Sequence, residues 1–322
     1  MEMIAKRPKV SVCIATYNQE KYIKDCLLSV LLQRFDVDIE ILIGDDASTD
    51  KTVEIVRCIA EQHPGLIKLF RHDVNLGASG NYQFLISRAT GDFIAHLDGD
   101  DFWLPGKLAR QMEFMKKHPA CSAVYTNAAV VDPDKTLWGV FNNKLPEFQD
   151  INYLLMRGNY LNHSSILYRS EMREEILSIS GDFIDYRIHC RLAMKGELGY
   201  LNNTLVVYRT GVETSMVLNI PDKVMERYWD ALLEANKDGV SADAWLAGVR
   251  NFWGRILYAS FRSGKTRKAH YWGKRIREEI GPSSKRVLIT GGFVCLELIY
   301  AAAINWCLSK FTSNPLRVAN RR

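Results

Sequence analysis

The chain has 322 residues, of which 47% are hydrophobic and 25% charged, and this composition excludes a disordered or fibrous protein. The formal net charge of +5 is unevenly spread, because the segment from Arg255 onward holds fourteen Lys or Arg and three acidic residues, a net +11. This local excess indicates a polyanionic partner, either nucleic acid or anionic lipid.

The apolar run after the basic N-terminus is short and strand-like, so we expect no secretory signal and a cytoplasmic chain. Strands and helices are predicted to alternate over the first hundred residues. The expected strands are 9–15, 39–44, 66–70 and 93–97, and the expected helices are 18–33, 51–62 and 82–89, with a glycine-containing loop at 75–81. Near-continuous apolar strands alternating with helices predict an α/β fold, a mostly parallel sheet flanked by helices.

The second half of the chain is less regular. Strands are predicted at 121–126, 163–169 and 199–209, and helices at 105–119 and 183–196. Beyond residue 220 the sequence becomes helical and basic. We therefore expect a first domain over residues 1–220 and a helical C-terminal extension over residues 221–322.

Polar clusters follow each of the first four strands: 16–18, 45–46, 75–77 and 98–101. In parallel sheets, ligands bind beyond the carboxyl ends of the strands, so these clusters are expected to converge on one crevice.

Three acids crowd the turn after the fourth strand. Asp98 and Asp100 are separated by a glycine that allows a tight turn, so both side chains can reach one cation. Mg²⁺ or Mn²⁺ is typically held by one or two carboxylates together with substrate phosphates. The turn therefore predicts a divalent metal site, although an isolated D-x-D pattern is also compatible with a solvated acidic turn.

Taken in order, the motifs VSVCIATYN, EILIGDDASTD, NLGASGN, GDFIAHLDGDDFWLPGK, NHSSILYR and FIDYRIHCRLAMKG resemble those of the family 2 glycosyltransferases. The resemblance covers roughly residues 9–210. The resemblance implies the Rossmann-like GT-A nucleotide-diphospho-sugar fold. Within the family, the sequence is similar to the branch that builds bacterial surface polysaccharide and lipopolysaccharide.

The resemblance also implies roles for individual residues. Those expected to contact the nucleotide-sugar donor are Thr16, Tyr17, Asn18, Asp46, Asn75, Gly77, Asp98, Asp100 and Asp101. Within this set, Asp98 and Asp100 match the pair that holds the metal. Asp185 matches the general base that removes the acceptor's proton, and Asp182 is the fallback for that role.

The sequence departs from the family pattern at three places. Ile184 stands where a glutamate usually precedes the base, and NLGASGN lacks the basic residue that often meets the donor phosphates. The segment after Tyr208 and Arg209 also lacks the histidine that often follows.

The expected activity is inverting, metal-dependent sugar transfer of the hexosyltransferase type, from a UDP-sugar by default, to a hydroxyl of a glycan or lipid-linked acceptor. Two alternatives remain open. A sugar-phosphate nucleotidyltransferase has a similar sheet but needs a Gly-rich basic loop, and the segment ATYNQEKY has no glycine. A non-catalytic nucleotide-sugar-binding protein would keep the crevice without the chemistry.

Residues 285–310 include an apolar stretch of 22 residues from Val287 to Leu308, interrupted by Glu297. A charge near the centre of a bilayer is costly, and basic residues flank both ends. We therefore expect a helix lying in an anionic membrane surface, with the protein peripheral on the inner face of the cytoplasmic membrane and no nucleic acid bound. A helix docked on the core or on a second subunit is the alternative, so an oligomer stays open.

Overall fold

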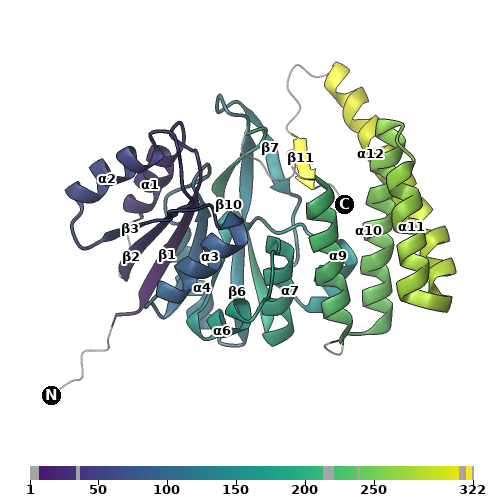
Figure 1. The fold of residues 1–322 in the computed structure, drawn as a ribbon, viewed down its shortest axis with the longest axis horizontal. Helices are drawn as coiled ribbons and strands as arrows, with labels where there is room; N and C mark the ends of the chain where they lie inside the picture. Colours follow the sequence, from purple (N-terminus) through teal and green to yellow (C-terminus); the bar gives the residue numbers. More distant parts are fainter. Residues whose placement is uncertain (1–6, 34–36, 213–220, 238–239, 312–316, 321–322) are drawn as a thin grey trace.

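The computed structural model describes residues 7–33, 37–212, 221–237, 240–311 and 317–320. A single mixed sheet has helices on both faces, and helices α9–α12 stand side by side at one end of it (Figure 1). The strands are β1 (Lys9–Thr16), β2 (Asp38–Asp45), β3 (Ile67–Arg71), β4 (Phe93–Asp98), β5 (Phe102–Trp103), β6 (Cys121–Val131), β7 (Leu137–Asn142), β8 (Phe148–Gln149), β9 (Leu167–Arg169), β10 (Glu197–Arg209) and β11 (Arg317–Asn320). The helices are α1 (Ile23–Leu31), α2 (Thr52–Gln62), α3 (Gly77–Arg88), α4 (Lys107–Lys117), α5 (Ile151–Arg157), α6 (Arg173–Leu177), α7 (Asp185–Lys195), α9 (Pro221–Lys237), α10 (Ala242–Ser263), α11 (Arg267–Ile280) and α12 (Ser284–Phe311).

The first four strands form the parallel half of the sheet in the order β3-β2-β1-β4. The register pairs Thr16 with Asp45 and Ala15 with Asp98. The carboxyl ends of β1, β2 and β4 therefore meet at one edge, as the alternation of strands and helices predicted.

The second half of the sheet is mixed rather than parallel. Strand β9 pairs antiparallel with both β4 and β6, while the long strand β10 runs parallel to β6 and antiparallel to β5 and β8. The α/β fold class is confirmed, and the parallel character is concentrated in β1–β4.

The bounds of several expected elements differ from those observed, and three of the differences lie near the strand ends. Helix α1 begins at Ile23 instead of residue 18; in the segment before it, the backbone N–H groups of Gln19 and Glu20 donate to Thr52 Oγ1 at the start of α2 and to Asp50 Oδ2. Helix α3 begins at Gly77, inside the expected loop, where the Asn75 side chain accepts the Gly77 N–H at 3.0 Å. The strand expected at 163–169 is a 3₁₀ turn at 163–165 followed by β9.

The sheet is buried on both faces. On β1, Val12 and Ile14 pack in the cluster that contains α1, α2 and α4, while Cys13 packs on the opposite side with Tyr82 and Leu85 of α3. Alternate residues of β1 are thus buried in two different cores, which explains why apolar residues point to both faces of the strand and not to one.

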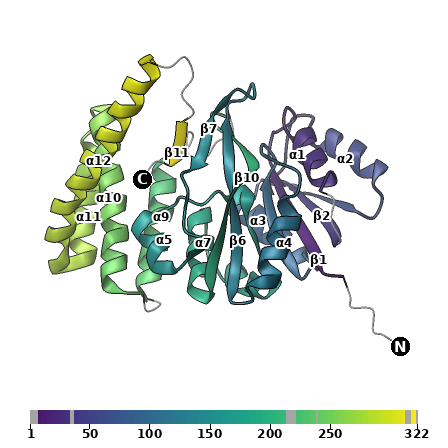
Figure 2. The same ribbon diagram turned by 180° about the vertical axis from the view of Figure 1, so that it is seen from behind.

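The second of these cores continues into the C-terminal helices without a break. Trp229 of α9, Phe252 of α10 and Trp272 of α11 pack ring against ring and belong to the same cluster as Tyr82. Figure 2 shows α9 lying between α7 and α10. Burial of this kind is worth about 25 cal/mol per Å² of apolar surface, so the helices α9–α11 are integral to the core.

Within the ranges that the structure describes, no helix is long and apolar enough to cross a bilayer. The stretch expected to lie at a membrane, 285–310, falls in α12, and its side chains beyond residue 303 are outside the described residues.

Candidate active site

The turn after β1 is built by hydrogen bonds to its neighbours. Thr16 is buried and donates from Oγ1 to Gln19 Oε1 at 2.8 Å. Asn18 adopts a left-handed backbone, φ 50°, and its Oδ1 accepts the N–H of Thr49 at 2.8 Å. Tyr17 lies between them and is 40% exposed, so its ring is available to a ligand while its neighbours shape the turn.

The ends of β1, β2 and β3 are tied together through Asp46. Its N–H donates to Thr16 O at 3.0 Å, and its Oδ1 accepts the N–H of Leu76 at 2.6 Å. The Asn75 side chain in turn donates to Asp46 O at 3.0 Å. Direct hydrogen bonds or adjacent positions thus join four of the expected donor-binding residues: Thr16, Asp46, Asn75 and Gly77.

Gly99 brings the acidic turn against β1. Its N–H donates to Ala15 O at 2.9 Å, and a Cβ at this position would lie 2.9 Å from Thr16 Oγ1 and 2.3 Å from Gln19 Oε1. Any larger side chain would push the turn away. The glycine therefore carries Asp98 and Asp100 to the same edge as Thr16.

The three acids of this turn have different surroundings. The Asp98 side chain is 45% exposed; its Oδ1 lies 2.9 Å from His96 Nε2, and its Oδ2 accepts from Ser164 Oγ at 3.1 Å. Burial opposes ionisation of Asp98, but the His96 and Ser164 contacts outweigh it and hold its pKa below the usual value.

Asp100 and Asp101 have raised pKa values. Burial first, and then the charge of Asp98, raise the pKa of Asp100 to about 7, which the Arg209 guanidinium only partly offsets. Asp101 is 1% exposed, and burial followed by repulsion from the other two acids raises its pKa well above normal. Its Oδ1 accepts the N–H of Arg209 at 2.8 Å, which ties the end of β10 to the turn.

The donor set at Asp98 and Asp100 fits a hard divalent cation. Burial and then repulsion from Asp98 raise the pKa of Asp100, and the charge of a bound cation would offset both. Among the described residues, no group of three or more His, Cys, Asp or Glu side chains could hold a metal ion. A metal at this pair would therefore need further oxygen ligands from a substrate diphosphate or water.

Asp185 is the first residue of α7, is half-buried, and interacts electrostatically with Asp98 of the acidic turn. Its Oδ1 accepts from Asn159 Nδ2 at 2.9 Å and from the N–H of Tyr186 at 2.8 Å. Burial raises its pKa to about 6, these two donors oppose the rise, and the charge of Asp98 adds to it. The carboxylate is therefore ionised at neutral pH and more basic than an ordinary aspartate.

Asp182, the fallback base, is engaged elsewhere. One of its carboxylate oxygens accepts from Ser79 Oγ at 3.2 Å, and the other forms an ion pair with Arg227 of α9. Ile184, at the position where the family has a glutamate, is buried in the core.

Three histidines behind the acids were not singled out together by the sequence. The His96 and His163 rings lie 4.4 Å apart, and His163 Nδ1 lies 3.2 Å from His189 Nε2. Burial and then the two neighbouring histidines hold the pKa of His163 well below normal, so this ring is neutral. The sequence spacing could have indicated two of them. His96 precedes Asp98 by two residues on a strand and His189 follows Asp185 by four on a helix, so each histidine lies on the same face as an aspartate.

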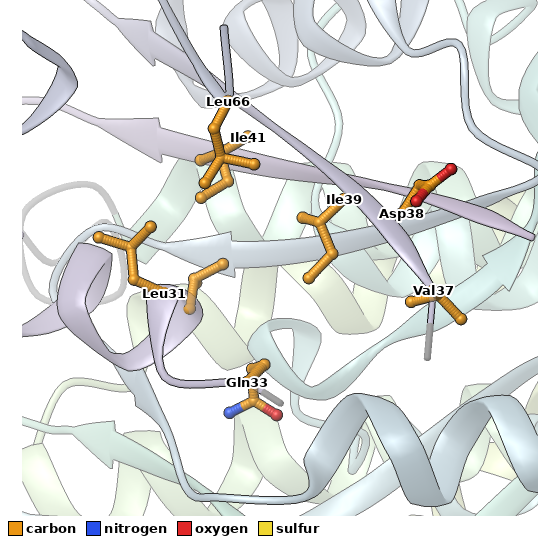
Figure 3. A pocket seen from close by; sticks show the side chains of 8 residues that line it. Leu31, Gln33, Val37, Asp38, Ile39, Ile41 and Leu66 are labelled. Atoms are coloured by element: carbon orange, nitrogen blue, oxygen red, sulfur yellow. The ribbon is translucent and has the colours of Figure 1, made fainter. Parts of the chain in front are cut away.

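A hollow of about 430 Å³ lies away from these residues, at the other ends of the strands (Figure 3). It is lined by Leu31 and Gln33 at the end of α1, by Asp38 and Ile39 at the start of β2, and by Leu66 before β3. Apolar side chains dominate it and the acidic turn contributes nothing, so it is separate from the candidate active site.

Residues 11–177, just over half of the chain, match the profile of the family described as Glycosyl transferase family 2. The matched segment includes Asp98 and Asp100 and ends before Asp185. The protein belongs to this family.

Two curated relatives share this region. An uncharacterized protein of Mycobacterium tuberculosis is 31% identical over 206 residues, which cover 62% of this chain and 58% of that protein. The Escherichia coli UDP-Glc:alpha-D-GlcNAc-diphosphoundecaprenol beta-1,3-glucosyltransferase WfaP is 32% identical over 192 residues, 58% of this chain and 71% of the relative. The chain thus matches little more than half the length of the first relative.

Solved structures show the same fold at low sequence identity. S. aureus TarS 1-349 in complex with UDP-GlcNAc has a TM-score of 0.60 at 16% identity, covering 88% of this chain and 79% of that one. The Pyrobaculum calidifontis mannosyltransferase PcManGT in complex with GDP-Man and Mn2+ has a TM-score of 0.59 at 18% identity, covering 92% and 87%. The chain therefore has the GT-A fold of these transferases.

Proposed function

We propose that the protein is an inverting glycosyltransferase that moves a sugar from a nucleotide-diphospho-sugar to a hydroxyl group of a glycan or lipid-linked acceptor. The observation that carries the proposal is the Asp185 carboxylate at the start of α7: it accepts hydrogen bonds from Asn159 Nδ2 and the Tyr186 N–H, and burial and then the charge of Asp98 raise its pKa to about 6. The pKa of Asp185 is raised and that of Asp98 is lowered. One carboxylate is therefore suited to act as a base, while the other stays ionised and is suited to a metal diphosphate.

The donor's nucleotide is assigned to the turn formed by Thr16, Tyr17 and Asn18, with Asp46 and the Asn75–Gly77 segment beside it. Tyr17 supplies an exposed ring for stacking, and the hydrogen bonds of the Asp46 cluster keep the other segments in place before the donor arrives. Preorganised contacts of this kind reduce the entropy cost of positioning the donor.

Asp98 and Asp100 would hold Mg²⁺ or Mn²⁺, which would supply positive charge to the departing diphosphate. Asp98 is the better anchor, because its contacts with His96 and Ser164 keep it ionised. A bound cation would also lower the pKa of Asp100, because its charge would offset the effects of burial and of the Asp98 charge.

Asp185 accepts the proton of the acceptor hydroxyl as that oxygen attacks the anomeric carbon. The nucleotide leaves from the opposite face of the sugar, so a single displacement inverts the anomeric configuration. No second carboxylic acid is required, because a diphosphate leaves without being protonated.

The donor class is tested by thermal unfolding with UDP-, GDP- and dTDP-sugars, each with and without Mn²⁺. We expect a UDP-sugar to stabilise the protein only when Mn²⁺ is present, by about 2.7 kcal/mol at a concentration near 100 Kd. UDP is preferred because the E. coli relative is named for UDP-Glc and the S. aureus structure holds UDP-GlcNAc. Absence of any metal-dependent stabilisation by all three classes would contradict the proposal.

A place in surface-polysaccharide synthesis follows from the same relative, whose named acceptor is a diphosphoundecaprenol-linked sugar. A lipid-linked acceptor requires the enzyme to work at a membrane. Helix α12 offers the means, because its side chains Ile289, Phe293, Leu296 and Tyr300 are between 61% and 71% exposed. Their spacing of three or four residues places them on one face of the helix.

The opposite face of α12 packs on the protein. Val287 and Cys295 are buried there, and Gly291 lies so close to α10 that a Cβ would be 2.2 Å from Trp253 Cδ1. Lys285 and Arg286 are exposed at the start of the helix, within the segment of net charge +11. We propose that this apolar stripe with its basic flank rests on an anionic membrane surface.

The membrane proposal predicts that Phe293→Glu combined with Leu296→Glu abolishes binding to vesicles containing anionic phosphatidylglycerol, because two charges then enter the apolar layer. Sedimentation with vesicles measures this, and Leu32→Glu, an exposed leucine at the end of α1, is the matched control. Retained vesicle binding would overturn the proposal. A change in oligomeric mass without a change in vesicle binding would assign the stripe to a second subunit instead.

A further inference from the structure

We propose that helix α9 positions the general base: Tyr228 holds both groups that donate hydrogen bonds to Asp185. The inference rests on the proposed function only in that Asp185 is taken as the base. It assigns Tyr228 and Asn159 as positioning residues, which act on the reaction through Asp185 without touching the substrate.

The first of the two donors is the Asn159 side chain. Its Nδ2 lies 2.9 Å from Asp185 Oδ1, while its own Oδ1 is buried without a hydrogen-bond partner. A buried carbonyl oxygen left unpaired costs free energy, so this orientation of the amide is retained for the bond that its nitrogen makes. An N–H donor also favours the ionised carboxylate, which is the form that can accept a proton.

Tyr228 holds the backbone of Asn159. Its Oη accepts the N–H of Asn159 at 3.1 Å, and the ring of Tyr228 is 6% exposed. The preceding residue, Gly158, has φ 77°, and a Cβ there would lie 2.5 Å from the Tyr228 hydroxyl. The chain therefore passes over Tyr228 at a distance that only glycine permits.

Tyr228 also packs against the second donor. Its ring stacks on that of Tyr186, with centroids 4.4 Å apart and planes at 18°, and the Tyr186 N–H donates to Asp185 Oδ1 at 2.8 Å. Displacing this ring would release the first turn of α7 at the residue next to the base. One side chain of α9 thus contacts both residues that orient the carboxylate.

Ion pairs hold α9 firmly against α7, so the position of Tyr228 is well defined. Glu234 of α9 accepts from Arg187 Nε at 2.6 Å and also pairs with Arg191. Arg227, next to Tyr228, pairs with Asp182 in the loop that leads into α7. Proton transfer tolerates only small changes in the distance between base and substrate. Packed, hydrogen-bonded neighbours keep the base within that range.

The test compares Tyr228→Phe and Asn159→Ala with controls that remove similar bonds elsewhere. Tyr228→Phe deletes the hydroxyl but keeps the ring, and Tyr271→Phe deletes another hydroxyl bond to α9, the one to Glu226. Asn152→Ala in α5 is the asparagine control. We expect kcat to fall about 10- to 100-fold in the two test variants, with the donor KM and melting temperature near wild type, and both controls to stay active.

The pH profile separates positioning from general structural support. The titratable groups of the described residues that interact with Asp185 include Asp98 and His96 of β4, Tyr125 of β6 and Tyr208 of β10, and these variants leave all four unchanged. Asn159→Ala removes a donor to the carboxylate, so the lower limb of the kcat profile should move to higher pH. Asn159→Asp, which replaces the donor by a like charge, should move it further.

Unchanged kcat and an unshifted limb in Tyr228→Phe and Asn159→Ala would overturn the inference, as would losses that only follow a fall in melting temperature. Asp185→Asn is assayed alongside. If Asp185→Asn is inactive and the positioning variants are normal, the inference fails while the proposed function stands. If Asp185→Asn remains active, the assignment of Asp185 as the base fails and the inference fails with it, whereas the proposed sugar transfer is tested separately by the donor screen.

Discussion

Replacing Asp185 by asparagine is expected to abolish sugar transfer while donor binding survives. Asparagine has nearly the same shape but cannot take a proton, and general-base catalysis is typically worth about 10²- to 10⁴-fold in rate. Turnover is measured with the donor found by the thermal screen, and donor affinity by calorimetry in the presence of Mn²⁺. Loss of both together would contradict a role confined to the base.

Asp182→Asn tests the fallback base; Asp182 lies three residues before Asp185, in the loop that leads into α7, and is engaged with Arg227 and Ser79. It should lose far less activity than Asp185→Asn, because it only weakens the ion pair with Arg227. If Asp182→Asn is the inactive variant and Asp185→Asn is not, the assignment of the base is wrong and moves to the fallback residue.

The acidic limb of the pH profile follows from the same carboxylate. Because burial and then the charge of Asp98 raise the pKa of Asp185 to about 6, its base form is lost as pH falls through about 6, and activity falls with it. The raised pKa also means that the charged form opposes folding above the unfolded pKa. Asp185→Asn should therefore melt no lower than the wild type at pH 7, which distinguishes lost chemistry from lost structure.

Replacing Asp98 by asparagine is the second change with a large expected effect. It removes the ionised partner of His96 and the better of two carboxylates for the cation, so we expect kcat to fall about 10²- to 10³-fold and the apparent affinity for Mn²⁺ to weaken. A titration of activity against Mn²⁺ measures both effects. In the wild type, a chelator should stop turnover and excess Mn²⁺ should restore it.

Asp134→Asn is the control for this charge change, because Asp134 is exposed in the turn between β6 and β7. Its activity and metal dependence should match the wild type. Full turnover of the wild type in a chelator would remove the metal from the mechanism and leave the acidic turn a structural feature.

Much of the site could be predicted from local sequence. The apolar runs of β1, β2 and β4 must be buried on both faces, and polar residues directly after them can only lie at the strand ends. This is why Thr16, Asp46 and Asp98 were expected at one edge, where register and hydrogen bonds now bring them together. The roles of these residues in binding stay predictions.

Other features depended on contacts that no local pattern encodes. Helix α1 starts late, after residues 19 and 20, whose N–H groups bond to Thr52 and Asp50 at the start of α2 and just before it. Asp101 is buried at the turn, where its Oδ1 accepts the N–H of Arg209 from β10. The histidines behind Asp98 were visible as spacings, but only packing shows that three separate elements place them in contact.

The sequence by itself determined the alternation of strands and helices, the acidic turn and the aspartate at the start of α7, because each rests on residue type and short-range periodicity. Tertiary structure alone decided that Tyr228 of α9 holds Asn159 and stacks on Tyr186. Tyr228 and Asn159 are separated by 69 residues. Their meeting depends on how α9 packs against α7 and α10, and that packing follows from burial of side chains from distant parts of the sequence.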